Sequence, residues 1–153
     1  MLVEGEEKDE LIKRINCIYH DAEHDEYDDR HEEIIVGEIS WWEKIGKKYI
    51  KDKFLDVSNA SFLDIGTGTG FVIRALTEHL NKTCQVIAYD LSQEMLKKAK
   101  SASSQPGNNI YNFVCGDAEV LPFADEHFDV ITINAVLHHL PNYKHCLNQV
   151  KRV

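Results

Sequence analysis

The chain has 153 residues, enough for one domain with a buried core, and its 43% hydrophobic and 28% charged residues are ordinary for a globular protein. No apolar run approaches the roughly 20 residues that span a bilayer, and the acidic start MLVEGEEKDE has no apolar segment typical of a secretory signal. The net charge is −9, and residues 1–38 alone hold 14 acidic and 4 basic residues. We therefore expect a cytoplasmic protein without a membrane partner, and nucleic acid, which favours a basic face, is an unlikely partner.

The N-terminal third of the sequence has helical spacing of apolar residues. In residues 8–20 the stripe consists of Leu11, Ile15 and Ile18. In residues 33–54 it consists of Ile35, Ile39, Trp42, Ile45 and Tyr49. Between them, residues 21–33 are dense in charge and read as a loop or a helix start. We predict an acidic helical cap over residues 1–57, followed by a second unit over residues 58–153.

The pattern changes at residue 61, where short apolar strands begin to alternate with helices. The predicted strands are residues 61–65, 85–90, 110–117 and 128–134. The predicted helices are residues 70–80, 92–102 and, after a turn, 140–153, with Ser92 as a helix N-cap. This alternation predicts the α/β class, with a parallel sheet flanked by helices on both sides. Strands of such apolar composition are expected to be buried on both faces.

Cysteine and histidine are the usual ligands of zinc, and the sequence has four cysteines and one histidine pair at helical spacing. Cys17, Cys84, Cys115 and Cys146 contain no CxxC pair and lie too far apart for zinc-ligand spacing, so buried reduced thiols are expected. His20 and His24 are one helical turn apart, but their acidic surroundings favour a solvated surface. The sequence therefore predicts no metal site.

The stretch FLDIGTGTGF, residues 62–71, places three glycines directly after the first predicted strand. In an open parallel sheet, ligands bind beyond the carboxyl ends of the strands, and glycine lets a ligand approach the main chain there. The glycines follow a GxGxG pattern, and Phe71 stands where the dinucleotide fingerprint GxGxxG has its third glycine. A bulky side chain there obstructs close packing of helix and strand, so an NAD-dependent oxidoreductase is the less favoured alternative.

Two acidic residues stand at the ends of the next strands. Asp90 ends the second strand, 20 residues after Gly70, where a carboxylate can accept hydrogen bonds from both hydroxyls of a ribose. Its alternative role is to cap the following helix. Asp117 ends the third strand and can accept from an adenine amino group while the N–H of Ala118 meets a ring nitrogen; the alternative is a turn-forming aspartate after Gly116. Together these residues point to an adenosine group.

At this point the sequence resembles the class I S-adenosylmethionine-dependent methyltransferases. LDIGTGTGF is similar to the glycine motif of that family, VIAYDLSQEML to its ribose motif, and CGDAEVLPFADEHFDVI to its adenine motif. NAVLHHL resembles the small-molecule branch, which includes quinone-biosynthesis methyltransferases. The resemblance covers residues 61–140. It implies a Rossmann-like sheet in the order 3-2-1-4, S-adenosyl-L-methionine as cofactor and a small-molecule methyl acceptor.

The resemblance also implies a role for each matching residue. The residues that would cradle the methionine part are Asp64, Gly66, Thr67, Gly68 and Gly70. Those that would hold the adenosine are Asp90 at the ribose, Leu91 packed on the adenine, and Asp117 and Ala118 at the adenine edge. Asn134 would lie near the amino-acid moiety, and Tyr27 would lie over the cofactor. Residues 135–139 would border the acceptor pocket. Within them, His138 and His139 are candidates for a catalytic base, since histidine titrates near neutrality; the alternative is that one caps a helix and the other packs.

The sheet of this family normally has seven strands, whereas four are predicted here. The resemblance therefore implies that the C-terminal strands are missing, which leaves a strand edge exposed. We expect the chain to self-associate through that edge or to have it covered by a partner. A non-catalytic S-adenosylmethionine-binding module and an inactive fragment stay open as alternatives to the enzyme.

Overall fold

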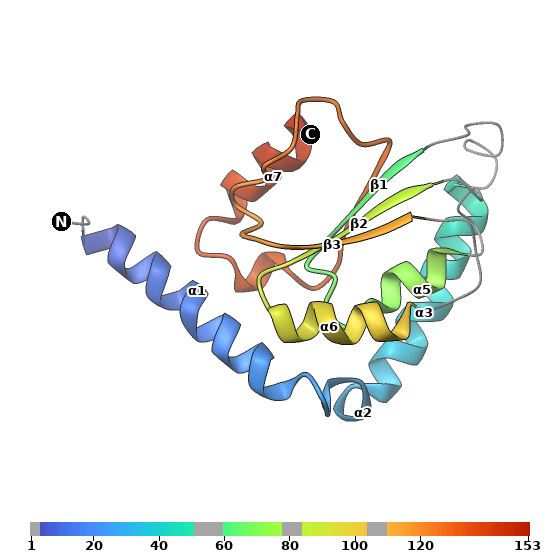
Figure 1. The fold of residues 1–153 in the computed structure, drawn as a ribbon, viewed down its shortest axis with the longest axis horizontal. Helices are drawn as coiled ribbons and strands as arrows, with labels where there is room; N and C mark the ends of the chain where they lie inside the picture. The colour runs from blue at the N-terminus through green and yellow to red at the C-terminus, as the bar shows by residue number, and fades with distance from the viewer. Residues whose placement is uncertain (1–3, 51–59, 78–83, 104–109) are drawn as a thin grey trace.

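In the computed structural model, which describes residues 4–50, 60–77, 84–103 and 110–153, four parallel strands form one sheet in the order β3-β2-β1-β4. Figure 1 shows β1, β2 and β3 side by side. The strands are β1 (Ser61–Ile65), β2 (Gln85–Asp90), β3 (Ile110–Cys115) and β4 (Val130–Ile133). In the register, Asp64 of β1 stands between Ala88 of β2 and Thr132 of β4. The predicted α/β class and strand order are confirmed.

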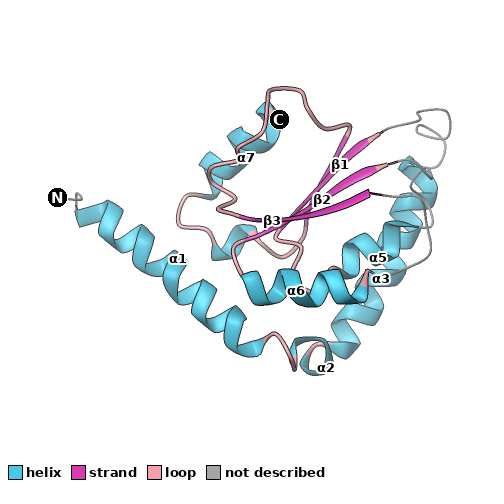
Figure 2. Ribbon diagram, viewed as in Figure 1, coloured by secondary structure: helices cyan, strands magenta, loops and turns pink. Residues whose placement is uncertain are grey.

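Helices cover both faces of this sheet (Figure 2). One face carries α3 (Glu32–Ile45), α5 (Phe71–Thr77) and α6 (Gln93–Ala102), and the other carries α7 (Tyr143–Arg152). Because side chains alternate along a strand, β1 supplies both cores. The first core includes Trp42, Phe62, Ile73, Leu76 and Val86. The second includes Leu63, Ile65, Tyr89, Cys146 and Val153.

The expectation that every strand is buried on both faces is correct for β1 and wrong for β3. Four of the five residues of β1 are buried, whereas no residue of β3 is. The physical reason is position in the sheet: β1 lies between two strands, and β3 is an edge strand with one strand neighbour. Apolar composition alone does not distinguish the two positions.

The N-terminal segment is helical, as predicted, but its first apolar stripe faces outward. It contains α1 (Glu4–Glu23), α2 (Tyr27–Arg30), α3 and the π-helix η1 (Gly46–Ile50). The predicted boundary between residues 57 and 58 lies outside the described residues. The stripe residues of α1 are highly exposed, with 56% of Leu11, 55% of Ile15 and 58% of Ile18 accessible to solvent. The opposite, more polar side of α1 faces the body of the protein.

The second stripe packs inward as predicted, except at its end. Ile35 and Trp42 are buried, and Ile39 and Ile45 pack against the first core. Tyr49 is 48% exposed, whereas Ile50 beside it is only 5% exposed. The cause is the π-helical turn of η1, whose wider repeat shifts the buried face by one residue.

Several smaller expectations have clear outcomes. Ser92 is the N-cap of α6, and its Oγ accepts a hydrogen bond from Met95 N at 3.1 Å. The cysteines are reduced, but only Cys84 and Cys146 are buried; the expectation of burial is wrong for Cys17, which is half-buried, and for Cys115, which is exposed. Cys115 ends the edge strand β3, which explains its exposure.

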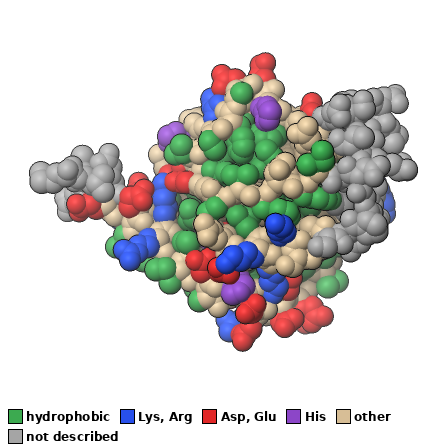
Figure 3. Space-filling view, viewed as in Figure 1, with side chains coloured by type: hydrophobic (Ala, Val, Ile, Leu, Met, Phe, Trp, Pro, Cys, Tyr) green, Lys and Arg blue, Asp and Glu red, His purple; other side chains and the backbone are tan. Residues whose placement is uncertain are grey.

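The surface of the protein has a mixed apolar and charged character. Figure 3 shows apolar side chains gathered over the middle of the visible face, with acidic side chains along its upper and lower edges. Within the described ranges, none of the helices combines the length and the apolar character needed to cross a bilayer. The same part of the chain contains no group of three or more histidine, cysteine or acidic side chains arranged to hold a metal ion.

Candidate functional site

The three glycines between β1 and α5 adopt backbone conformations that other residues rarely take. Their φ angles are +65° at Gly66, +52° at Gly68 and +80° at Gly70. The N–H groups of Gly66 and Thr67 both donate to the carbonyl of Tyr89, at 2.7 and 3.1 Å, which fixes this bend against the end of β2. The sequence prediction of a bend that requires glycine is confirmed.

Space as well as conformation restricts the first of these glycines. A Cβ atom added to Gly66 would collide with the side chain of Val136, which follows β4. A Cβ added to Gly68 would meet no atom within 4 Å. The two glycines therefore serve the site differently: Gly66 allows two loops to approach each other, and Gly68 presents bare main chain to the cavity.

Asp90 is joined to the glycine bend by a direct hydrogen bond. Its Oδ2 accepts from Gly68 N at 2.8 Å, and its Oδ1 accepts from Ser92 N at 2.8 Å. Burial raises the pKa of this carboxyl, while the hydrogen bonds from Ser92 and Gly68 act in the opposite direction. Ser92, not Asp90, is the helix cap, so Asp90 braces the turn between β2 and α6 and faces the cavity.

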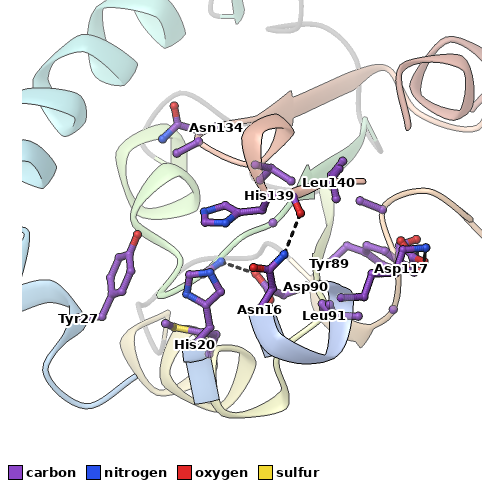
Figure 4. A pocket seen from close by; sticks show the side chains of 18 residues that line it. Asn16, His20, Tyr27, Tyr89, Asp90, Leu91, Asp117, Asn134, His139 and Leu140 are labelled. Carbon is purple, nitrogen blue, oxygen red and sulfur yellow. Dashed lines mark hydrogen bonds and ion pairs between the residues drawn. The ribbon is translucent and has the colours of Figure 1, made fainter. Parts of the chain in front are cut away.

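Most of the residues that the sequence predicts for the site line one cavity at the carboxyl ends of the strands (Figure 4). These are Tyr27, Gly66, Gly68, Asp90, Leu91, Asp117, Ala118, Asn134 and His139. Figure 4 shows Tyr27 and Asn134 at one side and Asp117 at the opposite side, with Asp90 and His139 between them. The structure thus brings together residues from loops that are far apart in the sequence.

Four predicted residues do not line this cavity. They are Asp64, Thr67, Gly70 and His138. Asp64 and Thr67 are 1% and 2% exposed and lie beneath the glycine bend. Asp64 accepts hydrogen bonds from Thr67 Oγ1 at 2.7 Å and from Thr132 Oγ1 at 2.5 Å. Burial raises the pKa of Asp64 to about 6, against the effect of both hydroxyl donors.

Asp117 marks the far end of the cavity, and both oxygens of its carboxylate are engaged. Its Oδ1 accepts from Glu119 N at 2.8 Å, so the turn-forming role that the sequence left open is present. Its Oδ2 lies 2.7 Å from Lys13 Nζ. The neighbouring Ala118 is only 8% exposed and also lines the cavity.

Sequence reasoning missed the residues that α1 contributes. Lys13, Asn16 and His20 recur at helical spacing and all line the cavity. Asn16 Nδ2 donates to the carbonyl of His139 at 2.8 Å, which holds α1 against the loop after β4. Their spacing is a usable signal, but nothing in the sequence marks this face as the inner one. The other lining residues that were not predicted are Tyr89, Met95, Gly116 and Leu140, whereas Ala135 and Val136 belong to the stretch expected to border the acceptor.

The side of the cavity after β4 carries an imidazole pair. The rings of His139 and His20 lie with their centroids 5.1 Å apart, and His138 is exposed beside them. Burial lowers the pKa of His139, and the neighbouring His138 and His20 lower it further. His139 is therefore biased toward the neutral form, which can accept a proton. Ala135 enters this loop with a φ of +54°, uncommon for a residue other than glycine.

The sequence is similar to those of known methyltransferases. A family model described as "Methyltransferase domain" matches residues 63–153. The demethylmenaquinone methyltransferase of Lactococcus lactis subsp. lactis (strain IL1403) is 35% identical over 98 residues, which are 64% of this chain and 39% of that protein. The demethylmenaquinone methyltransferase of Lactobacillus johnsonii is 32% identical over 128 residues, which are 83% of this chain and 51% of that protein.

A solved structure also matches the fold of this chain. The crystal structure of the YcgJ protein from Bacillus subtilis matches with a TM-score of 0.58 and 28% identity, over 72% of this chain and 46% of that one. The chain thus spans about half or less of the length of the relatives it matches. The family match covers the glycine bend, both acidic strand ends and the loop after β4. The chain therefore belongs to the methyltransferase domain family, and the resemblance carried by its sequence motifs is confirmed.

Proposed function

We propose that the chain binds S-adenosyl-L-methionine in this cavity and takes part in methyl transfer to a small-molecule acceptor. The observation that carries the proposal is the hydrogen bond between Asp90 and the glycine bend, in a cavity that ends at Asp117. A carboxylate suited to ribose hydroxyls, bare main chain at Gly68 and a second carboxylate in the same cavity are groups that suit this cofactor. Family membership supports the same cofactor.

The protein residues would act by holding and orienting the cofactor. Leu91 and Ala118 offer apolar contact to an adenine ring, and Asn134 and Tyr27 lie at the opposite side, where the methionine part would extend. When bound, the cofactor supplies a methyl group that its sulfonium makes electrophilic. Asp64, Thr67 and Gly70 would contribute from beneath the bend, by fixing its shape.

The acceptor is proposed to be a quinone-type small molecule, since two of the relatives are named demethylmenaquinone methyltransferases. His139 lines the cavity and is biased toward its neutral form, so we assign it the removal of a proton from the acceptor. His138 stays a second candidate, exposed beside it. The cytoplasmic location and self-association through the free edge of β4 also stay predictions.

Calorimetric titration with S-adenosylhomocysteine tests the cofactor assignment. The wild-type protein is expected to bind it and to give no heat with NAD. Asp90→Ala is expected to weaken binding by roughly tenfold or more, because charge-assisted hydrogen bonds to the ribose and the brace on Gly68 are lost together. Circular dichroism confirms that the variant is folded.

The matched control is Asp25→Ala, which makes the same change in charge at a side chain that is 85% exposed. It is expected to leave the affinity unchanged. A folded Asp90→Ala protein with wild-type affinity would remove Asp90 from the site, and a wild-type protein that binds NAD instead would overturn the assignment.

A further inference from the structure

Lys13 of α1 connects two carboxylates at the Asp117 end of the cavity. Its Nζ lies 2.7 Å from Asp117 Oδ2 and 2.9 Å from Glu119 Oε2. The three side chains are largely shielded, with exposures of 16%, 27% and 7%. Burial acts to lower the pKa of Lys13, but the hydrogen bonds to both carboxylates outweigh it and raise the pKa. The ammonium is therefore charged wherever the protein is folded at neutral pH.

The ammonium of Lys13 reduces the capacity of Asp117 to accept a hydrogen bond from a ligand. Asp117 Oδ1 is engaged by Glu119 N, and Oδ2 is engaged by Lys13. A carboxylate oxygen that already accepts from an ammonium is a weaker acceptor for a neutral amino group, because its charge is partly neutralised. Lys13 itself is only a donor, and it lines the same cavity. The end of the cavity thus presents a carboxylate and an ammonium side by side.

Glu119 is a second ion-pair partner of Lys13, in addition to Asp117. Its Oε1 accepts from Asn142 N at 2.6 Å, which fixes the carboxylate at the start of α7. Its Oε2 remains directed at Lys13. Lys13 therefore keeps one charged partner, Glu119, if its ion pair with Asp117 breaks. The stronger the Lys13–Glu119 ion pair is, the more easily the Lys13–Asp117 ion pair breaks.

We propose that Lys13 is a specificity-determining residue that weakens recognition of an adenine amino group by Asp117 and favours a carbonyl oxygen at the same position. The inference rests on the proposed function, since it concerns the adenine end of the same cofactor site. An adenosyl group presents an amino donor at that position, whereas an inosyl group presents a carbonyl acceptor. The carboxylate of Asp117 can accept from the amino group, and the ammonium of Lys13 can donate to the carbonyl. By pairing with Lys13, Glu119 frees Asp117 and so favours the adenosyl group.

The experiment is calorimetric titration with S-adenosylhomocysteine and with its deaminated analogue, S-inosylhomocysteine. Lys13→Met is expected to bind the adenosyl ligand about three- to tenfold more tightly than the wild type and the inosyl ligand more weakly. Glu119→Gln keeps the acceptor for Asn142 N but loses the ion pair with Lys13, so it is expected to bind the adenosyl ligand more weakly. Lys13→Arg keeps the charge and is expected to resemble the wild type.

Lys97→Met is the charge-matched control, because Lys97 is 69% exposed and pairs with Glu94 at 2.6 Å. It should change neither affinity, and thermal unfolding confirms that each variant is folded. If Lys13 merely supported the site, Lys13→Met and Glu119→Gln would both weaken binding of the adenosyl ligand. That result, or an unchanged ratio of the two affinities in Lys13→Met, overturns the inference. A wild-type protein that binds neither ligand refutes the proposed function instead.

Discussion

Replacing Gly66 by alanine is expected to destabilise the protein by about 2–5 kcal/mol, the sum of a left-handed backbone and an overpacked contact. The backbone term arises because the φ of Gly66 is +65°. The packing term arises because the new methyl group would collide with the side chain of Val136, so the bend and the loop after β4 would have to separate. Urea unfolding, followed by circular dichroism, measures the loss.

Gly68→Ala is the matched control for this prediction. Its φ of +52° is similar, but the added methyl group meets no atom within 4 Å. It is expected to cost only the backbone term, about 1–2 kcal/mol. Val136→Ala should restore part of the stability of the Gly66→Ala protein, because it removes the colliding methyl groups. Equal losses in the two glycine variants, without rescue by Val136→Ala, would contradict the close approach of the two loops.

The second large effect is expected at Asp64, whose burial makes the free energy of unfolding depend on pH. The pKa of Asp64 rises from 3.8 to about 6 on folding. The folded state therefore binds the proton more tightly than the unfolded state, and the stability gained from this is present below about pH 4 and lost as the pH rises through 6. The loss amounts to about 3 kcal/mol, at 1.36 kcal/mol for each unit of pKa.

Asp64→Asn removes the ionisation and keeps an oxygen acceptor for Thr67 or Thr132. Its free energy of unfolding is expected to be close to that of the wild type at pH 4 and to exceed it by up to about 3 kcal/mol at pH 8. Urea titrations at a series of pH values measure the difference. Asp125→Asn, at a side chain that is 77% exposed, is the control and should show no comparable trend. A difference between Asp64→Asn and the wild type that does not change with pH would show that Asp64 is not desolvated.

The part of the site that follows the strands could be predicted because topology fixes it. The carboxyl ends of parallel strands meet at one edge, so residues directly after β1, β2 and β3 must be neighbours. Gly68, Asp90 and Asp117 follow that rule and line one cavity. The motif alone does not predict which side chains of the bend are buried. Asp64 belongs to the same motif, yet its side chain points beneath the bend to Thr132, on a strand that is far away in sequence.

The contribution of α1 could not be predicted because its pattern gives the wrong face. An apolar stripe normally marks the side of a helix that packs, but Leu11 and Ile15 are exposed, and Lys13 and Asn16 face the protein. The polar side is chosen because its partners are specific groups on other loops, such as the carbonyl of His139. No periodicity in α1 itself reveals where those partners lie.

The way in which α1 is attached sets it apart from the rest of the molecule. Of its described side chains only Glu23 is buried, and the helix is fastened by contacts such as those of Lys13, of Asn16 and of Asp21 with Ser92 Oγ. The sheet, in contrast, is held by two apolar cores. Separating α1 from the loops thus needs less free energy than melting the strands. Because α1 also lines the cavity, its separation from the loops would open the site to small molecules without disrupting the sheet.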